Sequence, residues 1–174
     1  MGNAAEDLRP RIYVACLAAY NAGRLHGAWI AVEDEETVWA AVEAMLKASP
    51  VAGAEEFAIH DHEGFGGVEI GEYAAIARVV EIARFVRERG RLGALVLEEV
   101  SGDLDAAREA FEDYRGAYAS LADYVAALIE DTIDIPQALR GYIDYEAMAH
   151  DARLNGEVFT VETAHDEVHV FGRR

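Results

Sequence analysis

The first third of the chain alternates short runs of apolar, β-forming residues with polar and glycine-containing connections. Runs of this kind at 11–17, 27–32 and 56–61 predict three strands, because β-branched and aromatic side chains fit a pleated, half-buried surface. The glycines that follow the third run mark a loop. We therefore expect a small β-sheet in this part of the chain.

One helix is predicted between the second and third of these strands. The acidic run 33–36 favours a helix N-terminus, where negative side chains complement the helix dipole, and the helix is expected to end before Pro50. Its apolar residues recur at helical spacing on one face: Val38, Trp39, Val42, Met45 and Leu46. This face is expected to cover the sheet.

The apolar period changes to that of a helix in the middle of the chain. A helix is predicted over 69–89, with Gly90 as its C-terminal cap. Shorter helices are predicted over 93–100 and 103–114. The middle section is therefore expected to be helical.

The last third returns to a mixed pattern. Ser120, with Asp123 three residues later, predicts the capped start of a helix that runs to about residue 130. Further helices are predicted over 134–142 and 145–154. The runs 157–163 and 167–171 alternate well enough to predict a terminal hairpin, so the fold class is α+β.

Composition identifies a folded, strongly acidic protein. The chain is 52% hydrophobic, and 33 Asp and Glu against 15 Lys and Arg give a formal net charge of −18. Lys47 is the only lysine, so the chain lacks the clustered cations that bind phosphates and nucleic acid is not an expected ligand. The acidic charge instead allows a protein partner that itself normally binds nucleic acid.

Compartment and redox chemistry follow from what the sequence lacks. Its apolar runs are too short to span a bilayer, and 1–10 has no basic start or apolar block of a signal peptide, so we expect a cytoplasmic protein without a membrane partner. Cys16 is the only cysteine, which excludes an internal disulfide and a cysteine-based zinc site.

Half of the chain's excess charge is concentrated in 98–134. This segment has eleven acids against Arg108 and Arg115, a net charge of −9. Like charges at helical spacing repel one another, so folding alone does not favour such a pattern. The acids are Glu98, Glu99, Asp103, Asp105, Glu109, Glu112, Asp113, Asp123, Glu130, Asp131 and Asp134.

Two interpretations of this acidic segment remain open on the pattern alone. It can be a solvated face, as in an acidic structural protein of a salt-adapted host, or it can substitute for the phosphates of DNA. Duplex DNA carries one charge per roughly 1.7 Å of its axis. A helix with one acid in three or four residues offers one per roughly 5 Å, so several acidic elements or a dimer are needed to match it.

One local cluster could carry a different chemistry. His60, His62 and Glu63 lie in the third predicted strand and the loop after it, and side chains two residues apart on a strand share a face. No further ligand follows at the spacing of a metal motif, so a structural role is favoured for these histidines. The alternative function is a small metal-dependent enzyme; no cofactor is otherwise expected.

A series of short motifs resembles the ArdA-type antirestriction proteins in identity and order. The motifs are Ile12-Tyr13-Val14-Ala15, Tyr20-Asn21-Ala22-Gly23, Gly27-Ala28-Trp29, Glu56-Phe57-Ala58-Ile59-His60-Asp61, Ile70-Gly71-Glu72 and Tyr142-Ile143-Asp144-Tyr145-Glu146-Ala147, the last followed by Asp151. The resemblance spans about 11–171, with the Tyr-Ile-Asp-Tyr-Glu-Ala segment as its characteristic part.

The resemblance implies a non-catalytic mimic of bent B-form DNA, carried by plasmids and conjugative elements. Such proteins occupy the DNA site of type I restriction–modification enzymes, on the methyltransferase core. It also implies three small domains in tandem and an elongated homodimer, for which a strand near Tyr118 and the terminal hairpin are possible pairing edges. With the boundaries above, the expected layout is a flexible leader 1–10, an α+β domain 11–66, a helical domain 67–113 and an α+β domain 114–174.

The resemblance adds further residues to the candidate surface. Asp144, Glu146 and Asp151 are expected to substitute for phosphates together with the acids of 98–134. Tyr142 and Tyr145 are expected to pack the last domain rather than to contact the target. No catalytic or metal-binding residue is assigned.

Overall fold

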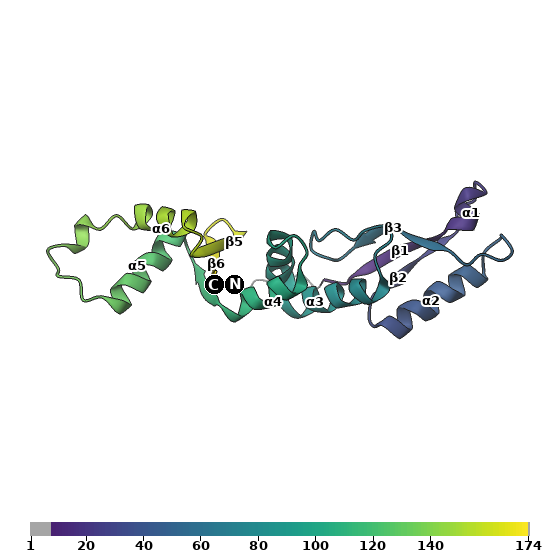
Figure 1. The fold of residues 1–174 in the computed structure, drawn as a ribbon, viewed down its shortest axis with the longest axis horizontal. Coiled ribbons are helices and arrows are strands. Elements are labelled where there is room, and N and C mark those ends of the chain that lie inside the picture. The colour runs from purple at the N-terminus through teal and green to yellow at the C-terminus, as the bar shows by residue number, and fades with distance from the viewer. Residues whose placement is uncertain (1–7, 174) are drawn as a thin grey trace. The chain divides into compact units, whose positions relative to one another are not determined.

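The structure is a computed structural model that describes residues 8–173, and it is of the α+β class (Figure 1). Within these residues it has six α-helices and two three-stranded antiparallel sheets. The chain forms two compact units, Met1–Leu104 and Asp105–Arg174. The α+β class is confirmed, whereas the division into three domains at residues 66 and 113 stays a prediction. Most of the predicted leader, 1–7, lies outside the described residues.

The first sheet forms from the three predicted strands. β1 (Arg11–Cys16) is its central strand, between β2 (Gly27–Ala31) and β3 (Phe57–Glu63), and both pairings are antiparallel. A short helix that the pattern did not predict, α1 (Leu17–Asn21), follows β1 directly. Ile12 and Val14 of the central strand are fully buried, and side chains two residues apart share one face of a strand.

Helix α2 (Glu35–Lys47) packs on this sheet with the predicted apolar face (Figure 1). Val38, Val42 and Met45 of this face are buried and Leu46 is half-buried, but Trp39 is exposed, so the prediction for Trp39 is wrong. Asp34 caps the helix by accepting a hydrogen bond from the backbone N–H of Thr37 at 2.8 Å, and hydrogen bonds from Thr37 lower the pKa of the Asp34 carboxyl. The predicted helix start is therefore confirmed to within two residues.

Gly27 is required by close packing between β1 and β2. A Cβ atom at this position would lie 2.5 Å from the carbonyl oxygen of Val14 and 2.7 Å from the hydroxyl of Tyr13. A side chain there would have to push the backbone of the central strand aside. Gly71, by comparison, has no atom within 4 Å of such a Cβ.

Helix α3 (Ile76–Glu99) starts seven residues later than the helix predicted over 69–89. The reason is a tertiary contact: the carbonyl of Glu72 accepts a hydrogen bond from the N–H of Ile59 at 2.9 Å, which holds this segment against β3 in a non-helical form. Gly90, predicted as a cap, has φ of 61° and interrupts the helical geometry inside α3. The helix predicted over 103–114 is observed as α4 (Leu104–Glu112).

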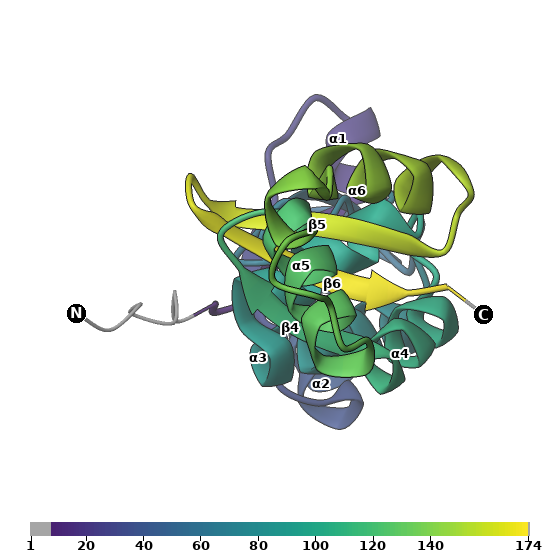
Figure 2. The same cartoon turned by 90° about the vertical axis from the view of Figure 1, so that its left-hand side faces the viewer.

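In the second unit, two helices lie on one face of a second sheet (Figure 1 and Figure 2). The helices are α5 (Leu121–Thr132) and α6 (Tyr145–Leu154). The sheet has β6 (Glu167–Gly172) between β4 (Tyr114–Tyr118) and β5 (Val158–Ala164), so the predicted terminal hairpin is confirmed. Its core joins these elements through Ala122, Tyr124, Val125, Ala149, Val158 and Val170.

The helix predicted over 134–142 is wrong. The structure has only a 3₁₀ turn, η1 (Arg140–Tyr142), preceded by a turn in which the N–H of Leu139 donates to the carbonyl of Pro136. Ile135 is the one residue of 134–142 that is buried, so no apolar stripe is available to pack a helix there. The segment between α5 and α6 is therefore an exposed loop.

Candidate functional site

The carboxylates predicted to substitute for phosphates are almost all exposed. Of the fourteen, thirteen are exposed and only Asp113 is half-buried. Glu98, Glu99 and Asp103 belong to the first unit and the other eleven to the second. They project from α3, α4, α5, α6 and the connections between them because they occupy the polar positions between buried apolar residues. The pattern thus predicted their exposure correctly.

Helix α4 carries the most regular row of acids. Asp105, Glu109 and Glu112 are spaced by four and three residues, which places them on one exposed stripe of the helix. Buried Leu104, Ala107 and Ala110 lie on another side. With a rise of about 1.5 Å per residue, the carboxylates of this stripe follow one another every 5 Å or so, as the sequence indicated. Asp105 also pairs with Arg108 of the same helix at 2.9 Å.

Asp113 does not fit the predicted surface. Its side chain is 18% exposed, and its Oδ1 atom lies 2.6 Å from the Nη2 atom of Arg115. The backbone carbonyl of Asp113 also accepts a hydrogen bond from the N–H of Gly172, which ties the start of β4 to the end of β6. Asp113 is therefore paired within the fold, and its assignment as a phosphate substitute stays a prediction.

Two of the predicted carboxylates also stabilise helix starts. Asp144 caps α6 by accepting a hydrogen bond from the N–H of Ala147 at 2.9 Å. Asp123 lies in the first turn of α5, where its Oδ2 atom accepts a hydrogen bond from the hydroxyl of Ser120 at 2.6 Å and its N–H donates to the same hydroxyl. These side chains are exposed but fixed in place by the backbone that they cap.

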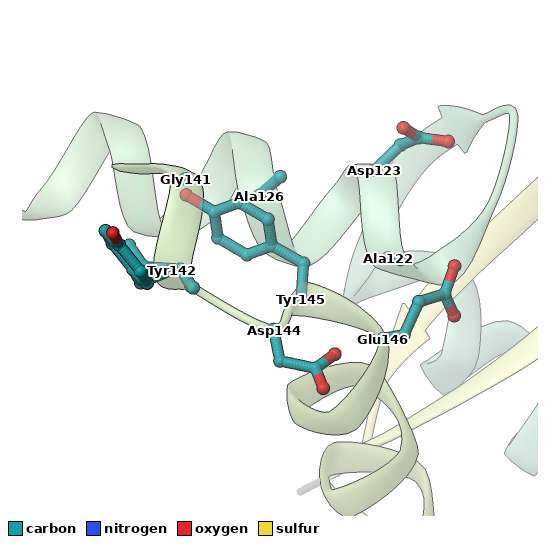
Figure 3. Close-up of a pocket in the computed structure, with 9 residues that line it drawn as sticks. Ala122, Asp123, Ala126, Gly141, Tyr142, Asp144, Tyr145 and Glu146 are labelled. Atoms are coloured by element: carbon teal, nitrogen blue, oxygen red, sulfur yellow. The ribbon is translucent and has the colours of Figure 1, made fainter. Parts of the chain in front are cut away.

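The family motif 142–147 forms one side of a hollow of about 490 Å³ at the starts of α5 and α6. Figure 3 shows Asp123 of α5, Asp144, which precedes α6, and Glu146 of α6 around this hollow. Tyr145 is half-buried, packs against the core of the second unit and donates a hydrogen bond to Glu130 at 3.4 Å. Burial raises the pKa of Tyr145, and the negative charge of Glu130 adds to the rise.

Tyr142 was predicted to pack within the last domain, and this is wrong. Its side chain is 87% exposed, because it falls on the 3₁₀ turn η1 rather than on a helix with a buried face. Ile143, the next residue of the motif, is half-buried and lines the same hollow. The motif therefore presents a free aromatic side chain beside three carboxylates (Figure 3).

A second hollow, of about 250 Å³, gathers three more of the predicted acids. Glu130, Asp131 and Asp134 line it together with Arg140, whose Nε atom donates to the carbonyl of Ile135. Three carboxylates around one guanidinium leave an excess of negative charge at the end of α5. The structure thus collects the predicted acids of the second unit into local groups.

The predicted metal-ligand cluster does not converge. His60 lies 3.8 Å from Glu72 and edge-on to the ring of Tyr20, whereas His62 lies 3.8 Å from Glu69. Glu63 pairs with Arg11 of the neighbouring strand. Each of the three has a separate partner, and residues 8–173 hold no group of three or more His, Cys, Asp or Glu side chains placed to bind a metal ion.

A partly buried polar network in the second sheet was not predicted from the sequence. His169 of β6 joins all three strands: its Nδ1 atom lies 2.7 Å from the hydroxyl of Tyr114 on β4, and its Nε2 atom lies 3.0 Å from the hydroxyl of Thr163 on β5. Thr163 donates its own proton to Glu167, so the imidazole Nε2–H must donate to Thr163 and Nδ1 must accept from Tyr114.

This pattern of hydrogen bonds fits the neutral form of His169. Burial lowers the pKa of His169, and the nearby Glu167 carboxylate opposes that shift only in part. Burial also raises the pKa of Tyr114, which keeps its hydroxyl protonated. All four side chains have hydrogen-bond partners inside the network, so its role is to hold the sheet together.

Comparison with known proteins decides the family. The profile of the family described as Antirestriction protein (ArdA) matches residues 12–167. The chain belongs to the ArdA antirestriction family. A search of curated proteins finds no match. The resemblance predicted from the order of the motifs is confirmed, and membership of the ArdA family gives the chain an antirestriction function.

The ArdA match extends over both compact units and includes the 142–147 motif with its acidic hollow. It also covers the acidic segment 98–134, so the surface described above belongs to the part of the chain that defines the family. None of the helices within residues 8–173 has the length and apolar character to cross a membrane.

Proposed function

We propose that the protein binds the DNA site of type I restriction–modification enzymes, on the methyltransferase core, and inhibits them without catalysis. The observation that carries this proposal is the exposure of thirteen predicted carboxylates in a member of the ArdA family. Lysine and arginine side chains that normally bind phosphates would bind these carboxylates instead. The protein would act in the cytoplasm of a cell that receives a mobile genetic element.

Charge spacing supports a homodimer in this function. One acidic stripe such as that of α4 carries a charge every 5 Å or so, about one third of the axial charge density of duplex DNA. Several stripes must therefore act together, and two copies of the chain would double the length of the acidic track. Three small domains in each copy would extend it further.

The test is competition with DNA. Purified protein should displace a labelled duplex from a type I methyltransferase core, and displacement should weaken as salt rises because the attraction is summed over many exposed charges. Failure to displace DNA at low salt from several such enzymes would contradict the proposal.

Two matched sets of substitutions locate the surface. The first set is Glu109→Gln, Glu112→Gln, Asp131→Asn and Asp134→Asn, whose carboxylates are exposed and make no ion pair within residues 8–173. The second set removes the same charge from exposed acids elsewhere: Glu36→Gln, Glu43→Gln, Glu55→Gln and Glu162→Gln. The first set should weaken displacement much more than the second, and equal losses would argue against a surface centred on 98–134.

A further inference from the structure

Helices α5 and α6 leave an apolar groove open between them on the second sheet. The groove has a volume of about 410 Å³. Val125 of α5 and Val158 of β5, both buried, belong to the core of this unit and also line the groove. Leu128 of α5 and Met148 of α6 line it as well, yet they remain 44% and 38% exposed. The hydrophobic core is thus accessible from the surface here.

The groove differs in chemistry from the acidic hollows of the same unit. Its wall continues with Ile129 and Ala152, which pack on the core, so the apolar lining runs from the two helices down to the sheet. The phosphate backbone of DNA has no comparable apolar surface, so carboxylates alone would be enough to imitate that backbone and the groove is not needed for it. Exposed apolar side chains that gather in a groove mark a site of binding rather than a solvated face.

The charges around the groove define what fits it. Asp151 and Glu157 also line the groove. Arg115 also lines it, but the carboxylate of Asp113 at 2.6 Å neutralises its guanidinium. The groove therefore combines apolar lining residues with a net negative charge. The complementary ligand is an apolar side chain with lysine or arginine on either side of it.

We propose that this groove receives an apolar side chain, flanked by lysine or arginine, from the DNA-binding surface of the inhibited restriction enzyme. The inference rests on the proposed function, because a surface that binds DNA supplies the basic residues. The groove adds a contact that DNA cannot make. This contact buries apolar surface, so its strength does not depend on salt, whereas that of the carboxylates does.

The methionines allow a direct test. The chain has three, of which Met148 lines the groove and Met45 is buried in the first unit. In protein labelled with ¹³C at the methionine methyl groups, addition of the methyltransferase core should shift or broaden the Met148 resonance and leave that of Met45 in place. Met148→Leu identifies the resonance and, as an apolar replacement of similar size, should preserve binding. A complex that forms with the Met148 resonance unchanged would overturn the inference.

Competition at two salt concentrations separates the groove from the carboxylates. Leu128→Asn and Met148→Asn should each weaken displacement of DNA by about tenfold, by the same factor at low and high salt, because each removes part of an apolar contact. Leu154→Asn is the matched control, since Leu154 is 71% exposed on α6 and does not line the groove. Groove variants that displace DNA as well as the control does would refute the groove contact.

Two other outcomes are distinguishable. If the unsubstituted protein does not displace DNA at all, the proposed function fails and the groove inference fails with it. If Leu128→Asn instead changes the oligomeric state measured by sedimentation without the enzyme, a second copy of the chain occupies the groove, which overturns the inference and leaves the proposed function standing.

Discussion

Phe171 is the residue on which the second sheet should depend most. It is fully buried, stacks on Phe159 with ring centroids 4.9 Å apart, and contacts Phe111 and Tyr114 at 5.5 and 5.0 Å. Phe171→Ala would remove the centre of this aromatic cluster. Truncating a buried phenylalanine costs about 3–5 kcal/mol, which combines the lost transfer free energy with the cavity that remains.

This cost is large for a unit of this size. At roughly 0.05–0.15 kcal/mol per residue, a unit that spans 105–174 has a free energy of unfolding of about 4–10 kcal/mol. Hydrogen exchange measured by mass spectrometry should therefore accelerate in β5 and β6 by about two to four orders of magnitude, at 1.4 kcal/mol per factor of ten. Tyr142→Ala, which truncates an exposed aromatic side chain of the same unit, should change exchange there little.

The reasoning would be refuted by a Phe171→Ala protein whose β5 and β6 exchange at the unsubstituted rate. It would also be refuted if Tyr142→Ala accelerated exchange in those strands as much as Phe171→Ala. Either result would mean that the aromatic cluster does not determine the stability of the sheet.

Three further predictions concern single side chains. Burial lowers the pKa of His169 in the folded state below the ordinary value of about 6.5, so the unfolded state takes up more protons as the pH falls. The contribution of the neutral His169 to the free energy of unfolding is therefore fully present above about pH 6.5 and is lost as the pH falls toward the folded-state pKa. Between about pH 7.5 and pH 5.5, the urea midpoint of the unsubstituted protein should therefore fall more than that of His169→Gln. The control His165→Gln, at an exposed site, should behave like the unsubstituted protein, and equal falls in all three proteins would contradict this. Gly27→Ala should destabilise the first unit by about 1–3 kcal/mol in thermal unfolding through the clash with the central strand, whereas Gly71→Ala should not, and similar melting of the two variants would argue against the clash. Asp144→Ala should lower stability by about 1 kcal/mol through loss of the α6 cap, while Asp144→Asn should keep the cap and remove only the charge; equal unfolding midpoints of the two variants would show that the cap does not matter.

Features of the fold that depend on neighbouring residues were predictable from the sequence. The start of α5 follows from Ser120, because a capping side chain acts on a backbone N–H three residues away. The start of α2 follows from the acidic run 33–36, whose charges act on the helix end beside them. The terminal hairpin was predictable for the same reason, since its strands are separated only by a tight turn. Exposure of the carboxylates followed from their places between apolar positions.

Features that depend on distant residues were not predictable. The segment before α3 has a helical pattern, but the hydrogen bond from Ile59 to Glu72 gives its backbone a partner on β3 instead. The sequence pattern does not distinguish Asp113 from the other acids of its segment, and only the fold shows that it pairs with Arg115. His169 finds Tyr114, 55 residues away in the sequence, across the sheet, and the sequence offers no pattern for that pairing.

Some of the exposed carboxylates contribute only charge, whereas others also cap a helix, and this difference affects how the surface can evolve. Glu109, Glu112 and Asp131 make no ion pair within residues 8–173, so what they contribute is charge alone, and aspartate and glutamate can replace one another there over generations. Asp144 must also reach the N–H of Ala147, which a longer side chain does less well. Relatives of this chain should therefore diverge freely along the acidic stripes in the identity and exact position of each acid while retaining aspartate at the start of α6.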